Sequence, residues 1–366
     1  MSAPEGVMSY QWPLEVEGLF TERYPQMVNT GLPAEDVDVV RSAITEMWAD
    51  APGGWVYEWS RLAERYAAAG SHGLAALAYG WAKFPTLADG AKRTALSHQI
   101  RQYQLAAPGF GVDFQRKMLD LPYRGGTTTL PVHVLTPPGV RRGPVLLFSG
   151  GVDGWKMDLH SLMTGLIHHL HMPLMAFDIP GTGESRVPMS PDGSEIVRGL
   201  IAHARTLGNG VVVHMGVSMG GHYSARTGLA GDPDAAIVLG APVEEAFAAR
   251  QVRFGMDGII GNALGYDRHP SLEELASALE AFSLRPLLDL DRQTPMLVIN
   301  GADDVHVPQA DTLIFQGRRD TEVHLLPDTG HCAITKLPEV LQIISAWLPR
   351  ALDGAAVDGA ATGQSR

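Results

Sequence analysis

The sequence is short of the features that place a protein outside the cell or in a membrane. It has one cysteine, Cys332, so no internal disulfide can form, which is typical of a reducing compartment. No apolar run reaches the length of about eighteen residues that a membrane span needs. The first ten residues contain neither a basic residue nor a long apolar stretch, which argues against a signal peptide. These absences predict a cytoplasmic protein.

Basic residues are also scarce. The 28 Lys and Arg are outnumbered by 40 Asp and Glu, giving a formal net charge of -12. Nucleic acids and anionic membranes require a basic patch, so we expect neither as a partner. The negative charge is explained most simply by solubility. We expect a small-molecule substrate and no cofactor or metal, and the oligomeric state is left open between a monomer and a homodimer.

The first part of the chain predicts a helical domain over residues 1–113. Apolar residues recur at helical spacing in two segments, and a third helix-like segment, 91–107, ends at Pro108. The recurring residues are Trp55, Trp59, Leu62, Ala63 and Tyr66, then Leu74, Leu77, Ala78 and Trp81. No β-branched run separates the segments, so these aromatic side chains indicate helix–helix packing.

Residues 114–352 predict an α/β domain. Short apolar runs alternate with helix-length segments, the pattern of buried parallel strands joined by crossover helices. The first pair of runs, around Gly125 and Gly126, predicts an antiparallel hairpin. The expected strands are 117–122, 130–135, 145–148, 173–178, 211–215, 236–239, 296–299 and 323–326.

Two further segments depart from the alternation. An insertion at about 243–290 is too long for a crossover and contains two helix-like stretches, 244–253 and 271–282, so we expect a helical lid. Residues 353–366 are glycine, alanine and polar residues that bury little surface, so we expect a disordered tail.

The strongest pattern is an apolar run that ends in a G-x-S-x-G motif. Residues 211–215 read as a strand, Gly216, Ser218 and Gly220 form the motif, and a helix is expected from about Met219. Strand, tight turn and helix in this order are the context of a nucleophile elbow. The turn strains the serine backbone, and the glycines let the strand and helix approach each other. We therefore predict Ser218 as a nucleophile.

A serine hydroxyl needs a base to take its proton and an acid to orient that base, in the chain order Ser, Asp or Glu, His. The strand 296–299 is followed by Asp303 and Asp304, and spacing to the end of the loop favours Asp304. The last strand is followed by His331. The predicted catalytic triad is therefore Ser218, Asp304 and His331. His306 shares the short loop of Asp304 and is badly placed to reach Ser218.

An oxyanion hole needs two backbone N–H donors. We predict that Met219, which follows the nucleophile, supplies one of them. Gly151 or Val152, in the glycine-rich loop 149–154, supplies the other. An ordinary glycine-rich turn is the alternative interpretation of that loop.

Three other patterns predict structure rather than chemistry. Residues 178–185 resemble a phosphate loop but lack its lysine and spacing, so we expect a tight turn beside the oxyanion loop. His222, after the elbow, is expected to pack or hydrogen-bond. No cysteine or carboxylate at ligand spacing accompanies the three clustered histidines, so they predict no metal site: His168, His169 and His171.

The motifs together resemble the α/β-hydrolase superfamily over about residues 115–350. The segments that carry the resemblance are 178–185, 216–221, 301–308 and 330–331. The pattern of Tyr66, Tyr79, Phe84-Pro85, Tyr103 and Pro108 is similar to a narrower group, the fermentation-respiration-switch-like esterases and pseudooxynicotine hydrolases. The resemblance implies a mostly parallel sheet flanked by helices and an N-terminal helical cap.

The resemblance also suggests substrate contacts and a range of reactions. It implies that a glutamate early in the insertion contacts the substrate, and Glu244 and Glu245 are the candidates. The alternative for both is a helix start, where acids complement the helix dipole. Trp155, just after the glycine-rich loop, is a further candidate contact. Some members of this group cleave carbon–carbon bonds of 1,3-dicarbonyl compounds, and related folds catalyse eliminations.

Three functions compete at this point. The leading hypothesis is a serine hydrolase that cleaves an ester or 1,3-dicarbonyl bond of a bulky, mainly apolar small molecule, such as a polyketide-type compound. The second is a lyase of natural-product biosynthesis that uses the same three residues to eliminate a carboxylate such as acetate. The third is a non-catalytic binding module, against which the complete triad counts.

Overall fold

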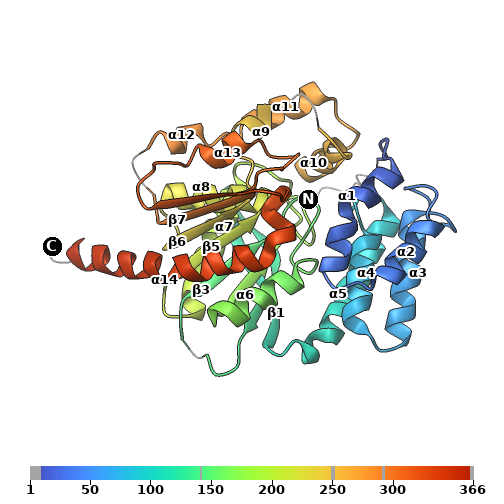
Figure 1. Cartoon of the computed structure of the whole chain (residues 1–366), viewed down its shortest axis with the longest axis horizontal. Helices are drawn as coiled ribbons and strands as arrows, with labels where there is room; N and C mark the ends of the chain where they lie inside the picture. The colour runs from blue at the N-terminus through green and yellow to red at the C-terminus, as the bar shows by residue number, and fades with distance from the viewer. Residues whose placement is uncertain (1–9, 141, 249–251, 291–292, 363–366) are drawn as a thin grey trace.

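The computed structural model describes the backbone of residues 10–140, 142–248, 252–290 and 293–362, and side chains up to residue 353 (Figure 1). It contains one eight-stranded sheet in the order β1-β2-β4-β3-β5-β6-β7-β8. Every strand predicted from the sequence is present. The bounds are β1 Asp113–Tyr123, β2 Gly126–Thr136, β3 Val145–Ser149, β4 Leu174–Phe177, β5 Val212–Val217, β6 Ala235–Leu239, β7 Met296–Gly301 and β8 Thr321–Leu326.

The sheet is mostly parallel. The hairpin β1–β2 is antiparallel and joins the rest through an antiparallel pairing of β2 with β4, whereas all the pairings from β4 to β8 are parallel. Strands β3 to β7 are buried along their whole length, which explains why they read as continuous apolar runs. The fold is therefore the expected α/β-hydrolase arrangement.

Helices cover both faces of this sheet. On one face lie α7 and α8, and on the other lie α6 and the start of α14 (Figure 1). Their bounds are α6 His160–Leu170, α7 Gly193–Leu207, α8 Met219–Ala230 and α14 Leu337–Thr362. Residues 353–362, expected to be disordered, thus continue α14. Alanine-rich sequence extends an existing helix easily because no new nucleation is needed.

The chain before the sheet forms a bundle of helices, which we call the N-terminal helical segment. The predicted spacing in residues 55–66 corresponds to α3, whose buried face includes Trp55, Trp59 and Leu62. Ring contacts among these and neighbouring aromatics make the core of the bundle. The helices are α1 Val16–Asn29, α2 Ala34–Ala43, α3 Trp55–Ala68, α4 His72–Ala82 and α5 Gly90–Ala106.

The insertion between β6 and β7 lies at the edge of the sheet, next to α1 (Figure 1). Its second predicted helix is α11, which begins with a capping box formed by Ser271 and Glu274. Its first predicted helix corresponds to α9, which is described up to Ala248; residues 249–251 lie outside the described residues, and residues 252 and 253 are not helical. The insertion comprises α9 Glu245–Ala248, α10 Met256–Leu264, α11 Leu272–Glu280 and α12 Arg285–Leu288. Within the described ranges, no helix combines the length and apolar character needed to cross a membrane.

Candidate active site

Ser218 sits on a sharp turn between β5 and α8. Its backbone angles, φ 56° and ψ -122°, lie in a region that non-glycine residues rarely adopt. A Cβ on Gly216 would lie 2.0 Å from the carbonyl oxygen of Gly220, and one on Gly220 would lie 2.3 Å from that of Gly150. Glycine is therefore required on both sides of Ser218, and the strained turn holds the hydroxyl at the N-terminus of α8.

A hydrogen-bonded array links this serine to the two residues predicted as its partners. The Nε2 atom of His331 lies 2.9 Å from the Ser218 Oγ atom. The Nδ1 atom of the same ring lies 2.7 Å from Oδ2 of Asp304. The three residues come from loops after β5, β7 and β8, whose ends meet at one edge of the sheet because the strands are parallel.

Asp304 is fixed by more than the histidine. Its Oδ2 atom accepts a hydrogen bond from the Asn300 side chain at 2.8 Å, and its Oδ1 atom accepts from the N–H groups of His306 at 2.7 Å and Val307 at 3.1 Å. Burial raises the pKa of this carboxyl, but the bonds from His331, Asn300 and His306 outweigh burial and leave the pKa below its ordinary value. Asp304 is therefore an anion beside the imidazole.

The pKa of His331 is shifted in the opposite direction to that of Asp304. Burial lowers the pKa of His331, but neighbouring Cys332 and the Asp304 carboxylate raise it, and the net pKa lies well above 6.5. The arrangement thus stabilises the imidazolium form that appears when the ring takes a proton from Ser218. Cys332 itself is a buried thiol whose backbone N–H donates to Asn300.

The competing residues of the acid loop lie elsewhere. Asp303 is exposed, and its backbone, not its carboxylate, bonds to Thr329. His306 lies 2.9 Å from Glu22 of α1 through its Nε2 atom, and its ring contacts the ring of His331 edge-on at 5.3 Å. His306 therefore borders the array without bonding to Ser218.

The loop after β3 narrows the choice of oxyanion donor. The N–H of Gly151 already donates to the carbonyl of Gly154 at 2.9 Å, so it is not free for a substrate. Val152, the next residue, lines the cavity at Ser218, and the described residues offer no hydrogen-bond partner to its N–H. The N–H of Met219 is the first of α8 and has no partner within that helix. Val152 and Met219 are thus the available donors.

Gly151 has a different role in this geometry. A Cβ there would lie 2.9 Å from Ser218 Cβ and 3.2 Å from Ser218 Oγ, closer than side chains normally pack. Its lack of a side chain therefore lets the loop pass directly over the serine.

The turn 178–185 binds Lys156, which lies just after the oxyanion loop, in line with the structural role expected for this turn. Asp178 binds the ammonium group of Lys156 and accepts from the backbone N–H groups of Lys156 at 3.0 Å and Glu184 at 2.9 Å. Lys156 also pairs with the Glu184 carboxylate at 2.9 Å, and all three side chains are buried. The pKa of Lys156 is raised because Asp178 and Glu184 together outweigh burial.

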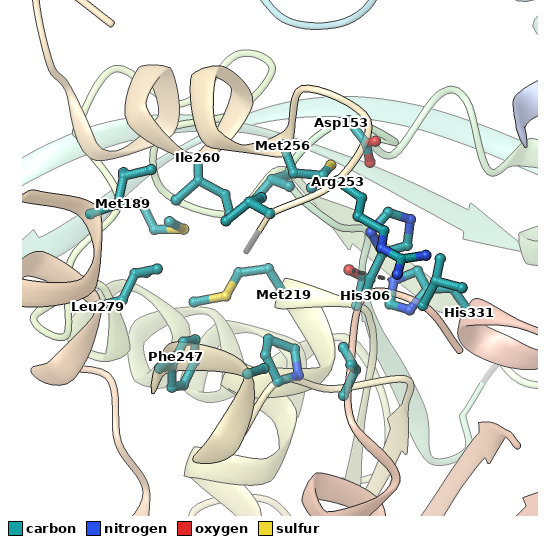
Figure 2. Close-up of a pocket in the computed structure, with 18 of the residues that line it drawn as sticks. Asp153, Met189, Met219, Phe247, Arg253, Met256, Ile260, Leu279, His306 and His331 are labelled. Carbon is teal, nitrogen blue, oxygen red and sulfur yellow. Dashed lines mark hydrogen bonds between the residues drawn. The ribbon is translucent and has the colours of Figure 1, made fainter. Parts of the chain in front are cut away.

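Two cavities meet at Ser218 and His331. The first, of about 970 Å³ including its open mouth, lies under the insertion and is mainly apolar (Figure 2). Its apolar lining includes Met189, Met219, Phe247, Met256, Ile260, Leu275 and Leu279. The second, of about 980 Å³ including open space, lies beside α1. Its lining includes Glu22, Gln26, Asp303, His306 and Thr335.

The three predicted substrate contacts lie outside both cavities. Trp155 is buried against the helical segment, with its indole N–H on the Val152 carbonyl and the ammonium group of Lys83 above its ring. The backbone N–H groups of Glu244 and Glu245 are bound by Asp311, which caps the start of α9. The helix-start interpretation therefore describes both glutamates, and the Glu244 carboxylate accepts from Ser283 at 2.7 Å.

The cavity also contains residues that the sequence did not point to. Arg23 of α1 and Arg253 of the insertion line the first cavity, and Glu22 and Arg23 line the second. No motif surrounds these residues, so only their positions in the folded chain reveal them. Among the described residues, no group of three His, Cys, Asp or Glu side chains is arranged to hold a metal ion.

Comparison with known proteins gives one family. A family model described as esterase FrsA-like matches residues 46–352. The esterase FrsA of Photobacterium profundum is 26% identical over 313 residues, which cover 76% of this chain and 72% of that protein. An α/β hydrolase of Aspergillus fumigatus, psoB, is 29% identical over 133 residues, 31% of this chain and 29% of that protein.

Solved structures share the whole architecture at low sequence identity. The structure named AbyA5 superposes with a TM-score of 0.78 at 20% identity and covers 94% of this chain and 99% of its own. A 2,6-dihydroxy-pseudo-oxynicotine hydrolase superposes with a TM-score of 0.72 at 19% identity and covers 90% and 95%. Because both matches extend over most of this chain, the N-terminal helical segment belongs to the shared fold.

Proposed function

Because this chain belongs to the FrsA-like esterase family and is an α/β-hydrolase enzyme, we propose that it is a serine hydrolase with Ser218 as its nucleophile. The observation that carries the proposal is the continuous array from the Ser218 hydroxyl through His331 to Asp304. It opens directly into an apolar cavity. The substrate class proposed is an ester of a bulky, mainly apolar small molecule.

The geometry supports the following reaction. His331 Nε2 takes the Ser218 proton while the Oγ–carbon bond forms, and the carbonyl electron pair moves onto oxygen. The N–H groups of Val152 and Met219 hold that oxyanion. When the intermediate collapses, the leaving alkoxide takes the proton from His331. A water molecule then repeats the sequence on the acyl-enzyme and releases the acid.

The first cavity supports the choice of substrate. One end is built from methionine, leucine, isoleucine and phenylalanine side chains, whereas Arg253, His306 and His331 lie at the other end (Figure 2). Apolar surface buried there contributes about 25 cal/mol per Å² to binding. We infer that the bulky apolar part of the substrate occupies this cavity, with its reacting carbonyl at the polar end.

Steady-state and burst kinetics with aryl esters of increasing acyl length test the proposal. We expect a burst of phenol equal to the enzyme concentration, and loss of turnover by at least about 10³-fold in Ser218→Ala. Full turnover by Ser218→Ala would contradict nucleophilic catalysis.

A second candidate is favoured by the cavity on the other side of Ser218. Both halves of a large substrate fit when cavities lie on either side of the reacting bond. Such a substrate suits cleavage of a carbon–carbon bond in a 1,3-dicarbonyl compound, or elimination of a carboxylate by His331 acting as base. Product analysis in ¹⁸O-water separates hydrolysis from elimination. Hydrolysis of an ester or of a carbon–carbon bond places the label in the acid, whereas elimination gives an alkene and an unlabelled acid.

A further inference from the structure

One turn of α1 contacts both loops that flank Ser218. Glu22 and Arg23 are consecutive on this helix, which lies at the side of the bundle nearest the sheet and α10 (Figure 1). Each of their side chains reaches a different loop. These two contacts, Arg23 with Asp153 and Glu22 with His306, join the N-terminal helical segment directly to the candidate active site.

Arg23 contacts the oxyanion loop. Its Nη2 atom lies 2.7 Å from Oδ2 of Asp153, and the two side chains are only 11% and 14% exposed. Asp153 follows Val152, whose N–H is the free donor of that loop. Burial lowers the pKa of Arg23, but the nearby carboxylates of Asp153 and Glu22 raise it to a net value above its ordinary one, so the guanidinium remains charged.

Glu22 contacts the acid loop. Its Oε1 atom lies 2.9 Å from Nε2 of His306. The backbone N–H of His306 donates to Oδ1 of Asp304 at 2.7 Å, and its ring packs edge-on against His331. Glu22 therefore supports the segment that presents Asp304 to the histidine.

The other end of the oxyanion loop is also held by the helical segment. Asp158 accepts from Lys83 at 2.7 Å and from Gln99 at 2.6 Å, and it accepts from the backbone N–H of Trp155 at 2.8 Å. Lys83 follows α4, and Gln99 lies on α5. The loop is thus fixed at Asp153 and again at Asp158 by three separate helical elements.

We propose that Glu22 and Arg23 are positioning residues, through which the N-terminal helical segment sets the geometry of the Val152 donor and of the Asp304 loop. The proposal rests on the serine-hydrolase function above. It gives α1 a second role besides lining the two cavities. An error of about 1 Å in a catalytic group can cost about 10²-fold in rate, so contacts that fix these loops act on kcat.

The test compares Arg23→Met with Arg41→Met. Arg41 of α2 pairs with Glu17 of α1, its side chain is 35% exposed, and among the described residues it has no hydrogen bond or ion pair to either loop, which makes it a matched control. We expect Arg23→Met to lower kcat about tenfold to 100-fold with KM changed less than about threefold, and Arg41→Met to change neither. Arg23→Lys, which restores one charged donor, is expected to recover part of the loss.

A second readout separates positioning from a general loss of structure. A boronic acid that forms a tetrahedral adduct on the serine should lose affinity in Arg23→Met by the same factor as kcat, while binding of the product acid stays unchanged. If Arg23→Met does not fold, Asp153→Asn breaks the same pair from the other side and carries the same expectation. For Glu22→Gln we expect a lower kcat and a shifted pH profile.

Three results overturn the proposal: unchanged kcat in both Arg23→Met and Asp153→Asn, an equal loss in Arg41→Met, or a change confined to KM. These results differ from failure of the proposed function. In that case the wild-type protein itself would show neither a burst nor acylation of Ser218.

An independent observation concerns the charge on the wall of the apolar cavity. Two arginines line it, and Arg23 is paired with Asp153. Arg253 is solvent-exposed, and among the described residues its guanidinium group has no hydrogen bond or ion pair, whereas its carbonyl accepts from the N–H of Met256. Figure 2 shows its guanidinium beside His306 and His331, at the end opposite Met189 and Leu279. A guanidinium without a carboxylate partner at this place contrasts with the formal net charge of -12 of the chain.

From this we infer that the substrate carries a carboxylate or similarly compact anionic oxygen group close to its reacting carbonyl, bound by Arg253. A planar guanidinium matches a carboxylate with two parallel hydrogen bonds. This refines the substrate class of the proposed hydrolase to an amphipathic ester with an apolar body and an anionic group at its reacting end.

Paired substrates test this inference. We compare a carboxylate-bearing half-ester with its methyl diester in the wild type, Arg253→Met and Arg253→Lys. The removed interaction is partly exposed, so we expect KM for the half-ester to rise about fivefold to tenfold in Arg253→Met and that for the diester to change less than about twofold. Equal effects on both substrates, or no effect on either, overturn the inference, whereas loss of diester turnover in the wild type would instead count against the proposed function.

Discussion

Replacing Asp304 with asparagine tests the array at a single atom. The Oδ1 atom of Asp304 accepts two backbone N–H groups, so the amide oxygen of the new side chain must take that place. The amide NH₂ then points at Nδ1 of His331, 2.7 Å away in the native protein, and faces the NH₂ of Asn300 as well. Nδ1 is forced to accept a hydrogen bond, so the proton moves to Nε2.

That tautomer removes the base. Nε2 carries a hydrogen toward Ser218 instead of a lone pair, so it cannot take the hydroxyl proton. We expect kcat/KM to fall about 10⁴-fold at neutral pH, which corresponds to about 5.5 kcal/mol of transition-state stabilisation. The assay is hydrolysis of an aryl ester by Asp304→Asn, with Asp328→Asn as the matched control because Asp328 is exposed and lines neither cavity.

The pH dependence of kcat/KM gives an independent test of the array. The pKa of His331 lies well above 6.5 in the native protein, and only the neutral ring acts as base. Wild-type kcat/KM should therefore rise with pH through an apparent pKa above 6.5. Removing the Asp304 charge lowers the pKa of His331. The rising limb of the Asp304→Asn profile should therefore lie at lower pH than that of the wild type. The reasoning is refuted by a loss of kcat/KM below about threefold in Asp304→Asn, by an equal loss in Asp328→Asn, or by a rising limb at the same pH in Asp304→Asn and the wild type.

Three further predictions concern the surroundings of the array. In Gly151→Ala the new Cβ would lie 2.9 Å from Ser218 Cβ, so we expect kcat/KM to drop about 10²-fold with little change in unfolding free energy; unchanged kinetics would contradict the close approach. Lys156→Met leaves the buried Asp178 carboxylate without a cation and Glu184 with Arg116 alone, so it should lower the unfolding free energy in urea by about 3–5 kcal/mol; a loss under about 1 kcal/mol would contradict the pairing. Phe247→Ala lengthens the apolar cavity, so the acyl chain length with the highest kcat/KM should increase, each further buried methylene adding about fourfold; an unchanged optimum would place the acyl chain elsewhere.

Much of the fold could be predicted because the relevant signals are local. Buried parallel strands are apolar on both faces, so β3 to β7 stand out as short continuous runs. The elbow is equally local, since steric demand fixes glycine at 216 and 220 around Ser218. Asp304 and His331 could be proposed because parallel strands end at the same edge of the sheet, which brings distant loops together.

The remaining features depend on contacts that no local pattern records. Whether Gly151 or Val152 offers a free N–H depends on the bond from Gly151 to Gly154, a detail of loop conformation. The sequence suggests Trp155 as a substrate contact, whereas the structure buries it against the helical segment. Glu22 joins His306 across 284 positions of the chain, so it carried no sequence signal at all.

The most direct test of the central claim is mass spectrometry of the acyl-enzyme. The wild-type protein is mixed with an activated aryl ester, quenched in acid during the burst, digested and mapped. We predict one acyl group per chain, on the peptide containing Ser218 and at that residue, and no adduct in Ser218→Ala. An acyl group on another residue, or turnover by wild type and Ser218→Ala at the same rate, would contradict the assignment of Ser218 as the nucleophile.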